Sequence, residues 1–223
     1  MLMTDAEINE AIAKGELEIV EFSLNSLQPA SYDMRLGARA LATNREEEVN
    51  IEKEGSLVIK AGDFALLTTH EKIRLSRTIA GHIGVRSYFT RKGLVLLAGL
   101  QIDPGFEGVL VLGVYNASPR NLVLDHLTPF CTVEFHRLSR PAEQVYRSGE
   151  EQRLGRIPAA DKDYLRTLET QTLSDMSSAV RGLSVNVQEL TQSMKKLAKV
   201  IYLGVLPLLL ATLAALLLFR VIG

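Results

Sequence analysis

Short apolar runs separated by turn residues fill the middle of the chain, from Leu57 to Phe135. The runs are Leu57–Ile59, Phe64–Thr68, Ile79–Val85, Leu94–Leu97, Val109–Tyr115, Leu122–Leu124 and Phe130–Phe135. Strands of this length, punctuated by Gly, Pro and Asn and lacking a βαβ rhythm, are typical of an all-β barrel or sandwich. We expect this mainly β domain to end near Pro141.

The residues before this region predict one helix and one strand. Residues 4–14 place apolar side chains at helical spacing, with Thr4 or Asp5 as the cap and Gly15 as the stop. Residues 31–37 alternate between apolar and charged positions, which predicts a strand with one buried face. The stretch from Asn44 to Glu54 is rich in charge and predicts a loop.

A change of pattern follows the β region. Residues 142–172 are polar and contain Gly149, Gly155 and Pro158, so they predict an extended arm or linker. Residues 173–199 then carry two interleaved seven-residue apolar series, which are heptad positions a and d of a parallel coiled coil. The series are Leu173, Val180, Val187, Met194 and Ile201, and Met176, Leu183, Leu190 and Leu197. The alternative is a single amphipathic helix that packs against the barrel.

Residues 200–219 contain no charged side chain. About 20 apolar residues span a hydrocarbon core of roughly 30 Å, so this run predicts a transmembrane tail anchor. Lys195, Lys196 and Lys199 precede the run and Arg220 follows it, a bias that places the β domain in the cytoplasm. A buried helix of a soluble protein is the alternative. No signal peptide is expected, because the N-terminus lacks a basic segment followed by an apolar core.

The charge and the metal-binding residue types narrow the functions. A net charge of −1 over 223 residues argues against a general nucleic-acid surface, although not against a local phosphate pocket. The single cysteine, Cys131, lies in an apolar run and predicts buried core filler. The four histidines show no metal-ligand spacing, so no protein-held metal site is expected.

Two stretches carry the side chains that bind phosphorylated ligands. The segment from Arg86 to Gly93 places Ser87, Arg91 and Lys92 around a turn, where guanidinium and hydroxyl groups can grip phosphate oxygens. A solvated charge cluster is the alternative. The segment from Asp103 to Gly108 places a carboxylate and the aromatic Phe106 on a Pro-Gly turn, which is otherwise an ordinary hairpin corner.

These stretches, taken in order, resemble the dCTP deaminase/dUTPase superfamily, and more closely its dCTP deaminase branch. The resemblance covers residues 3–147 and runs through the motifs Asp5–Ile8, Pro29–Gly37, Arg86–Leu94, Ile102–Gly108, Val114–Asn116 and Phe135–Tyr146. It implies a distorted β-barrel over residues 1–147 that assembles as a homotrimer, with active sites between subunits. It also implies a pyrimidine deoxynucleoside triphosphate ligand held with Mg²⁺.

The resemblance assigns roles to particular residues. Ser87 and Arg91 match the residues at the phosphates and the pyrimidine, while Asp103 matches the aspartate that orients sugar and water, with Phe106 beside it. Arg86, Lys92 and Gly93 complete the segment from Arg86 to Gly93, which we call the phosphate loop. Residues 148–172 match the phosphate-closing arm only loosely, with Arg153 and Arg156 as candidates. Tyr88 replaces a small residue of this loop, and the interval from Arg91 to Asp103 is one residue short.

The decisive departure lies at Gly113. The deaminase pattern has a glutamate at this position that shuttles the protons of deamination, and glycine has no side chain for general acid–base chemistry. The sequence therefore favours a membrane-anchored nucleotide sensor or sequestering module that does not deaminate. One alternative is an active deaminase, or a pyrophosphatase that uses Asp103. The other is a structural trimer that presents a protein-interaction surface.

Overall fold

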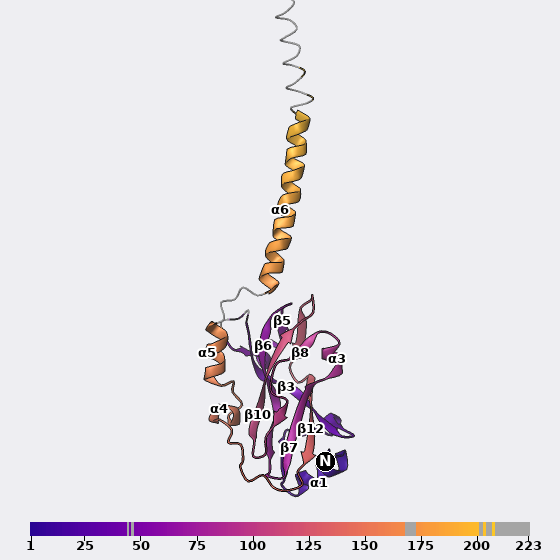
Figure 1. Cartoon of the computed structure of the whole chain (residues 1–223), viewed down its shortest axis with the longest axis vertical. Helices are drawn as coiled ribbons and strands as arrows, with labels where there is room; N and C mark the ends of the chain where they lie inside the picture. Colours follow the sequence, from indigo (N-terminus) through magenta and orange to yellow (C-terminus); the bar gives the residue numbers. More distant parts are fainter. Residues whose placement is uncertain (44, 46, 168–172, 201–202, 204–206, 208–223) are drawn as a thin grey trace, which may run out of the picture. The chain divides into compact units, whose positions relative to one another are not determined.

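The computed structural model describes residues 1–43, 45, 47–167, 173–200, 203 and 207, in two compact units, Met1–Ser174 and Asp175–Gly223. Figure 1 labels the larger elements of the first unit. In chain order the elements of this unit are α1 (Asp5–Ala13), β1 (Leu17–Val20), a 3₁₀ turn (Leu24–Ser26), β2 (Leu27–Gln28), β3 (Ser31–Ala42), β4 (Val49–Asn50), α2 (Ile51–Glu54), β5 (Ser56–Ile59), β6 (Phe64–Leu75), β7 (Ile79–Val85), α3 (Ser87–Thr90), β8 (Leu94–Leu96), β9 (Gln101–Ile102), β10 (Glu107–Asn116), β11 (Leu122–Asp125), β12 (Pro129–Arg137), α4 (Glu150–Arg153) and α5 (Ala159–Thr167).

One antiparallel sheet of ten strands forms the body of this unit (Figure 1). Its hydrogen-bonded path runs β8-β10-β6-β3-β12-β7-β9, with β1 beside β6 and with β2 and β4 beside β3. Strands β11 and β5 form a separate pair. The twelve-residue strand β3 pairs with both β6 and β12, and a register shift between Leu36 and Ala40 lets it bend from one to the other. The sheet therefore curls into an open half-barrel, which confirms the prediction of a mainly β fold.

The concave face of the sheet encloses the core. Alternate positions of the long strands point inward, so that Tyr32, Leu67, Phe130 and Phe135 are completely buried. Cys131 lies among them, and burial raises the pKa of its thiol well above the usual value. An uncharged thiol in apolar surroundings is unreactive, which confirms Cys131 as core filler.

The predicted N-terminal helix and strand are both present, but residues 32–34 are all buried, so the strand does not have the single buried face that was predicted. Thr4 caps α1 in a capping box with Glu7, and Gly15 ends the helix region at a φ of +69°. The stretch predicted as a charged loop also contains β4 and the single turn α2. Asn50 caps that turn by accepting a hydrogen bond from the Lys53 N–H, and Ile51 is fully buried beneath it. One buried apolar residue thus orders a segment whose composition predicts a loop.

The extended linker predicted after the barrel is wrong for residues 148–167. This segment contains α4 and α5 and belongs to the first compact unit. Ile157 is fully buried and Leu165 nearly so, and both pack with Leu41 and Leu66 on the outer face of the sheet. The other large apolar residues of this segment, Leu154 and Tyr164, are exposed, so the sequence shows no regular apolar pattern that would predict this docking.

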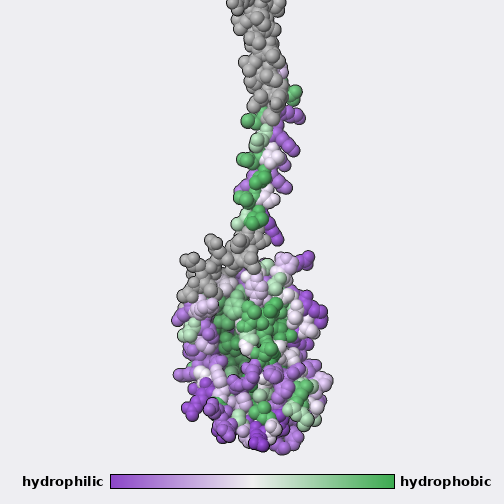
Figure 2. Space-filling model, in the orientation of Figure 1, coloured by the Kyte–Doolittle hydropathy of each residue, from purple (hydrophilic) through white to green (hydrophobic). Residues whose placement is uncertain are grey.

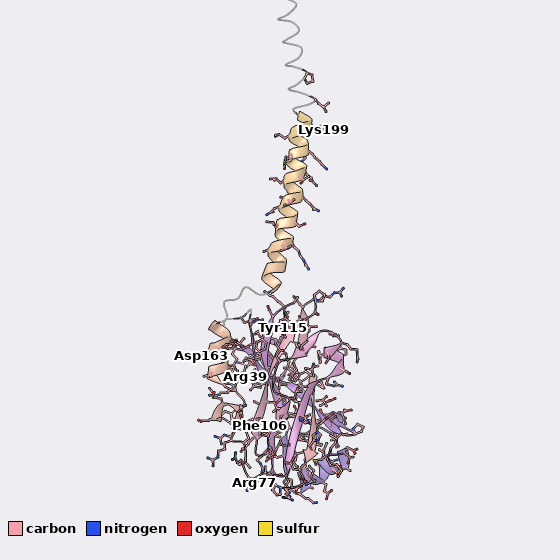
Figure 3. The ribbon with its side chains drawn as sticks, in the orientation of Figure 1. Arg39, Arg77, Phe106, Tyr115, Asp163 and Lys199 are labelled. Carbon is pink, nitrogen blue, oxygen red and sulfur yellow. The ribbon has the colours of Figure 1, made fainter. Side chains whose placement is uncertain are left out.

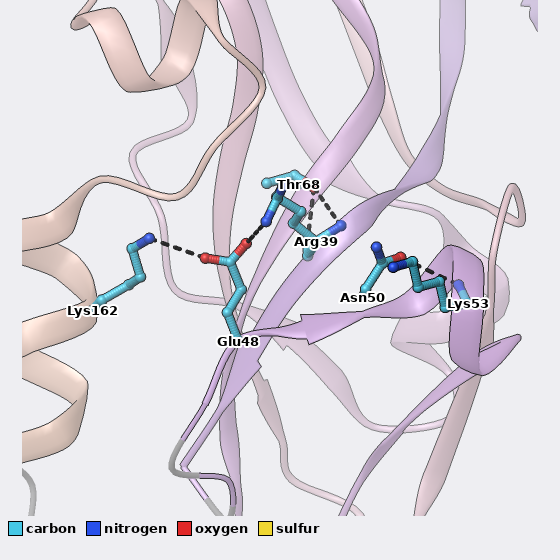
Figure 4. Close-up of polar contacts among 6 residues, drawn as sticks. All are labelled: Arg39, Glu48, Asn50, Lys53, Thr68 and Lys162. Carbon is cyan, nitrogen blue, oxygen red and sulfur yellow. Dashed lines mark hydrogen bonds and ion pairs between the residues drawn. The ribbon is translucent and has the colours of Figure 1, made fainter.

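Glu48 ties α5 to the sheet (Figure 4). Its two carboxylate oxygens accept hydrogen bonds from Arg39 Nη1 at 2.6 Å and from Lys162 Nζ at 3.0 Å. Burial raises the pKa of Glu48, but the hydrogen bonds from Arg39 and Lys162 outweigh burial and hold that pKa below its ordinary value. The ionised carboxylate is therefore the form that links β3 to α5.

This network predicts an acid-sensitive contribution to stability. Because the folded-state pKa of Glu48 is lowered, its contribution is present above the unfolded value near 4.5 and is lost as the pH falls through the folded value. We expect the urea midpoint of the protein to exceed that of a Glu48→Gln variant at pH 7, and the difference to shrink at about pH 3. A difference that does not depend on pH would contradict this assignment.

The second unit contains α6 (Leu173–Val200) from Asp175 onward, and this helix lies where the coiled coil is predicted. Its heptad side chains Val180, Leu183, Val187, Leu190, Met194 and Leu197 are all more than half exposed. Figure 2 shows apolar side chains along one side of α6 and polar side chains along the other. In a single chain this stripe faces solvent, so the coiled-coil pairing stays a prediction.

The predicted membrane anchor falls almost entirely outside the described residues. Of residues 200–219, the structure describes only Val200, Leu203 and Pro207. Within the described part of the chain, no helix combines the length and the apolar character needed to cross a bilayer. The anchor therefore stays a prediction from the sequence.

Candidate functional site

The turn from Asp103 to Gly108 is held against the end of β6. The Gly105 N–H donates to the Leu75 carbonyl at 3.1 Å, and the Leu75 N–H donates to the Phe106 carbonyl at 2.9 Å. Gly105 has a φ of +87°, a conformation that favours glycine. Phe106, labelled in Figure 3, is buried just before β10. Asp103 is exposed. The turn therefore holds the carboxylate and the aromatic ring in a fixed relation, as predicted.

A cavity of about 220 Å³ opens beside this turn. Strands β7, β9 and β10 supply apolar lining residues, which are Ile83, Ile102, Leu110, Val111 and Leu112. Gln101, Asp103, Tyr146 and Gln152 add polar groups. Gln101 Nε2 donates to Asp103 Oδ1 at 2.6 Å, which orients the carboxylate. This volume lies below the roughly 300–1,000 Å³ of most drug-sized ligand sites.

The predicted phosphate loop forms α3 and the turn after it. Ser87, Arg91 and Lys92 are exposed there, while the Lys92 ammonium lies 3.9 Å from the centre of the Tyr88 ring. Gly93 has a φ of +95°, and a Cβ atom there would lie 2.7 Å from Ser118 Cβ. Gly93 is thus required by the close approach of two loops. Ser87 and Arg91 remain available to an anion, whereas Lys92 already donates a hydrogen bond to the Tyr88 hydroxyl.

Arg86 differs from its neighbours because the fold already uses its side chain. Its guanidinium Nε lies 3.0 Å from Oδ2 of the buried Asp33, whose other oxygen accepts a hydrogen bond from the Thr132 hydroxyl. The backbone N–H of Arg86 donates to the Phe130 carbonyl at 3.0 Å. In one chain Arg86 therefore anchors the phosphate loop to β3 and β12.

The phosphate loop and the Asp103 turn lie at opposite ends of β10. The turn leads into its first residue, whereas the Ala117 N–H, just after its last residue, donates to the Gly93 carbonyl. Ten residues of strand span about 30 Å. Accordingly, none of the residues from Arg86 to Gly93 lines the cavity. A single chain does not bring the two predicted groups together.

Gly113 lies on β10 but does not line the cavity. It pairs with Leu66 of β6, and a Cβ atom at this position would lie 2.8 Å from Phe64 Cζ. The Phe64 ring thus occupies the space that a side chain at Gly113 would enter. Glu107, on the same strand, and Glu134, on β12, are both exposed, and neither lines the cavity.

The arm after the barrel supplies lining residues that the sequence did not single out for the site. The Tyr146 ring stacks on Phe106 with centroids 5.9 Å apart, and Gln152 of α4 lies beside it on the cavity wall. The predicted arm residues Arg153 and Arg156 are exposed and do not line the cavity. Gln101 was also missed, although its position two residues before Asp103 on a strand is a signal that could have identified it.

Comparison with known proteins agrees with this architecture. The dCTP deaminase-like family matches residues 2–138. A dCTP deaminase of Pyrococcus abyssi is 38% identical over 147 residues, which is 66% of this chain and 90% of that protein. A dUMP-forming dCTP deaminase of Aquifex aeolicus is 31% identical over 169 residues, which covers 71% of this chain and 94% of that protein.

A solved structure shows the same fold. The crystal structure of 2'-deoxycytidine 5'-triphosphate deaminase from Agrobacterium tumefaciens matches with a TM-score of 0.50 and 21% identity. The match covers 60% of this chain and 46% of that one. This likeness agrees with the fold, and the sequence matches show that the chain belongs to the dCTP deaminase-like family.

Proposed function

We propose that this protein binds a pyrimidine deoxynucleoside triphosphate without deaminating it, as a sensor or a sequestering module. Gly113 is the observation that carries the proposal. It leaves the family's proton-shuttling position without a side chain, and the Phe64 ring fills the space. A general acid–base group contributes about 10²–10⁴-fold to the rate of such a reaction, so its loss removes most of the catalysis.

The binding site lies between subunits of a homotrimer in this proposal. Within one chain the exposed Arg91 and the Asp103 cavity belong to opposite ends of β10, so one nucleotide needs the loop of a second copy. Figure 2 shows an extended apolar area on the visible face of the first unit. The exposed side chains of Val95, Leu97 and Leu100 add apolar surface for contact between copies.

In this proposal, Mg²⁺ binds together with the triphosphate. Mg²⁺ prefers oxygen ligands and is commonly held by one or two carboxylates together with substrate phosphates. Among the described residues, Asp103 is the one carboxylate that lines the cavity. The described residues include no cluster of three His, Cys, Asp or Glu side chains that could hold the ion alone. The phosphates would supply the remaining ligands and the ion would neutralise their charge.

In the same proposal, residues 173–219 form a stalk that holds this domain at a membrane. The exposed apolar stripe of α6 supports a parallel coiled coil over residues 173–199. The uncharged run 200–219 and the three preceding lysines support a single-pass anchor with the β domain in the cytoplasm. A nucleotide-binding domain fixed at a membrane would report or withhold its ligand there.

A pyrophosphatase is the second candidate. The exposed Asp103 carboxylate, oriented by Gln101 at the mouth of the cavity, could position a water molecule for attack on a magnesium-bound triphosphate. This chemistry does not need a carboxylate at Gly113. It would release diphosphate and leave a nucleoside monophosphate.

One experiment separates these functions. The purified protein is incubated with dCTP, dUTP or dTTP plus Mg²⁺, and its thermal unfolding and the nucleotide products are both measured. We expect a stabilisation of about 2.7 kcal/mol at a ligand concentration 100 times the dissociation constant, with no uracil nucleotide formed from dCTP. Diphosphate release would favour the second candidate. Uracil formation, or no stabilisation by any of the three, would refute the proposal.

A further inference from the structure

The arm after β12 lies directly on the Asp103–Gly108 turn of its own chain. The Tyr146 N–H donates to the Pro104 carbonyl at 2.8 Å. Two residues later, the hydroxyl of the buried Ser148 accepts a hydrogen bond from the Glu107 N–H at 2.7 Å. Backbone and side-chain contacts on both sides of Phe106 therefore fix the arm beside the cavity.

Two glycines of the turn are needed for this close approach. A Cβ atom at Gly105 would lie 2.7 Å from Val145 Cβ, and one at Gly108 would lie 2.6 Å from the Gln152 carbonyl oxygen. Both glycines have positive φ angles, of +87° and +139°. The turn and the arm are thus shaped to each other over residues 145–152.

The far end of the arm is held at a second place. Ile157 and Leu165 are buried against Leu41 and Leu66, and Glu48 bonds to Lys162 of α5 and to Arg39 of β3. Within α4 and its turn, Glu151 accepts hydrogen bonds from the Arg156 N–H and the Ala159 N–H. The arm is therefore anchored on both sides of the residues that line the cavity.

We propose that residues 145–167 form one wall of the cavity. Glu48 is the positioning residue that keeps this wall against the cavity. Glu48 does not touch the cavity, so it acts through α5. When its ion pair with Lys162 is absent, the arm opens more often and the cavity loses the wall formed by Tyr146 and Gln152. The part of this inference that concerns ligand release rests on the proposed function, whereas the arm's attachment does not.

Hydrogen exchange of the full-length protein tests the attachment. Three variants are compared with the parent: Glu48→Gln, Lys162→Gln, and Glu10→Gln as a control that removes the exposed Lys14–Glu10 pair. We expect amides of residues 145–157 to exchange about tenfold faster in the first two, the size expected for losing one charge-assisted hydrogen bond. Exchange in β3, β6 and β12 should stay unchanged, and the control should resemble the parent.

Lys162→Gln separates the loss of the Glu48–Lys162 ion pair from local effects on the sheet, because this variant leaves the Arg39–Glu48 pair in place. Faster exchange in Glu48→Gln alone, in neither variant, or equally over the whole first unit would overturn the proposal. Gly108→Ala provides an independent check. Its Cβ displaces Gln152 directly, so faster exchange confined to the arm is expected there as well, and an unchanged arm would contradict the packing argument.

Nucleotide dissociation gives the functional readout. With dCTP plus Mg²⁺, we expect Glu48→Gln and Lys162→Gln to release the nucleotide several-fold faster while the association rate changes little, because an open wall shortens the residence time. An unchanged release rate despite a mobile arm would show that the arm is not a wall of the site. If no nucleotide binds even to the parent, the proposed function fails while the exchange result still decides how the arm is held.

Discussion

Replacing Arg35 by methionine is expected to lower the free energy of unfolding by about 3–5 kcal/mol, because it leaves a buried carboxylate without its partner. The side chain of Glu71 is completely buried in β6. Its Oε1 accepts a hydrogen bond from Arg35 Nε at 2.6 Å, and its Oε2 accepts one from the Arg35 backbone N–H at 2.8 Å. Methionine keeps the length of the side chain but removes the charge and the first of these bonds.

Urea unfolding of the variant and the parent measures this loss. The double variant Arg35→Met, Glu71→Gln is the matched control, since the neutral amide removes the uncompensated charge and should recover part of the stability. A single-variant loss below about 1 kcal/mol, the range of exposed ion pairs, would mean that water reaches Glu71 and that the pair is not buried in solution.

Replacing Arg91 by alanine is expected to weaken the binding of dCTP plus Mg²⁺ by roughly 10- to 200-fold, since hydrogen bonds to charged groups contribute about 1.5–3 kcal/mol. Arg91 is exposed after α3, whereas the neighbouring Arg86 is engaged with Asp33. Arg91 is therefore the guanidinium in this loop that a triphosphate can recruit without dismantling the fold. Isothermal titration calorimetry measures the dissociation constants of the variant and the parent.

Arg45→Ala is the matched control for Arg91→Ala. Arg45 lies in the loop after β3 and does not line the cavity, and its guanidinium pairs with Glu54 at 3.4 Å, so its loss removes the same positive charge from another loop. The affinity of the control should stay within about twofold of the parent, because surface charges separated by more than a Debye length are largely screened. Equal weakening in both variants would show that Arg91 contributes only to the overall charge.

Sequence patterns predicted most of the strands correctly, but the structure extends several of them. Residues 79–85 form β7 with the predicted bounds, because an apolar run between two turns has few other conformations. The run beginning at Phe64 instead continues to Leu75, through the charged Glu71, Lys72 and Arg74. Glu71 is an inward-facing acid, and only its pairing with Arg35 on β3 makes that position compatible with a strand.

Some residues of the candidate site could likewise be predicted from the sequence and others could not. Asp103 and Phe106 could be identified because a Pro-Gly turn restricts the backbone locally. Tyr146 and Gln152 could not be placed at the cavity from the sequence, since they reach it through contacts with Phe106, 40 residues away, and with Gly108, 44 residues away. The same holds for Glu48, whose partner Lys162 lies 114 residues away.

The sequence by itself determined the strand pattern, the family motifs, the missing carboxylate at Gly113 and the heptads of α6, since each of these depends on residue type and local spacing. Only the tertiary structure decided that Arg86 is bound within the fold, that Phe64 fills the space beside Gly113, and that residues 148–167 pack on the sheet. The reason is physical: long-range contacts depend on how a curled sheet brings distant residues together, and local periodicity carries no record of that geometry.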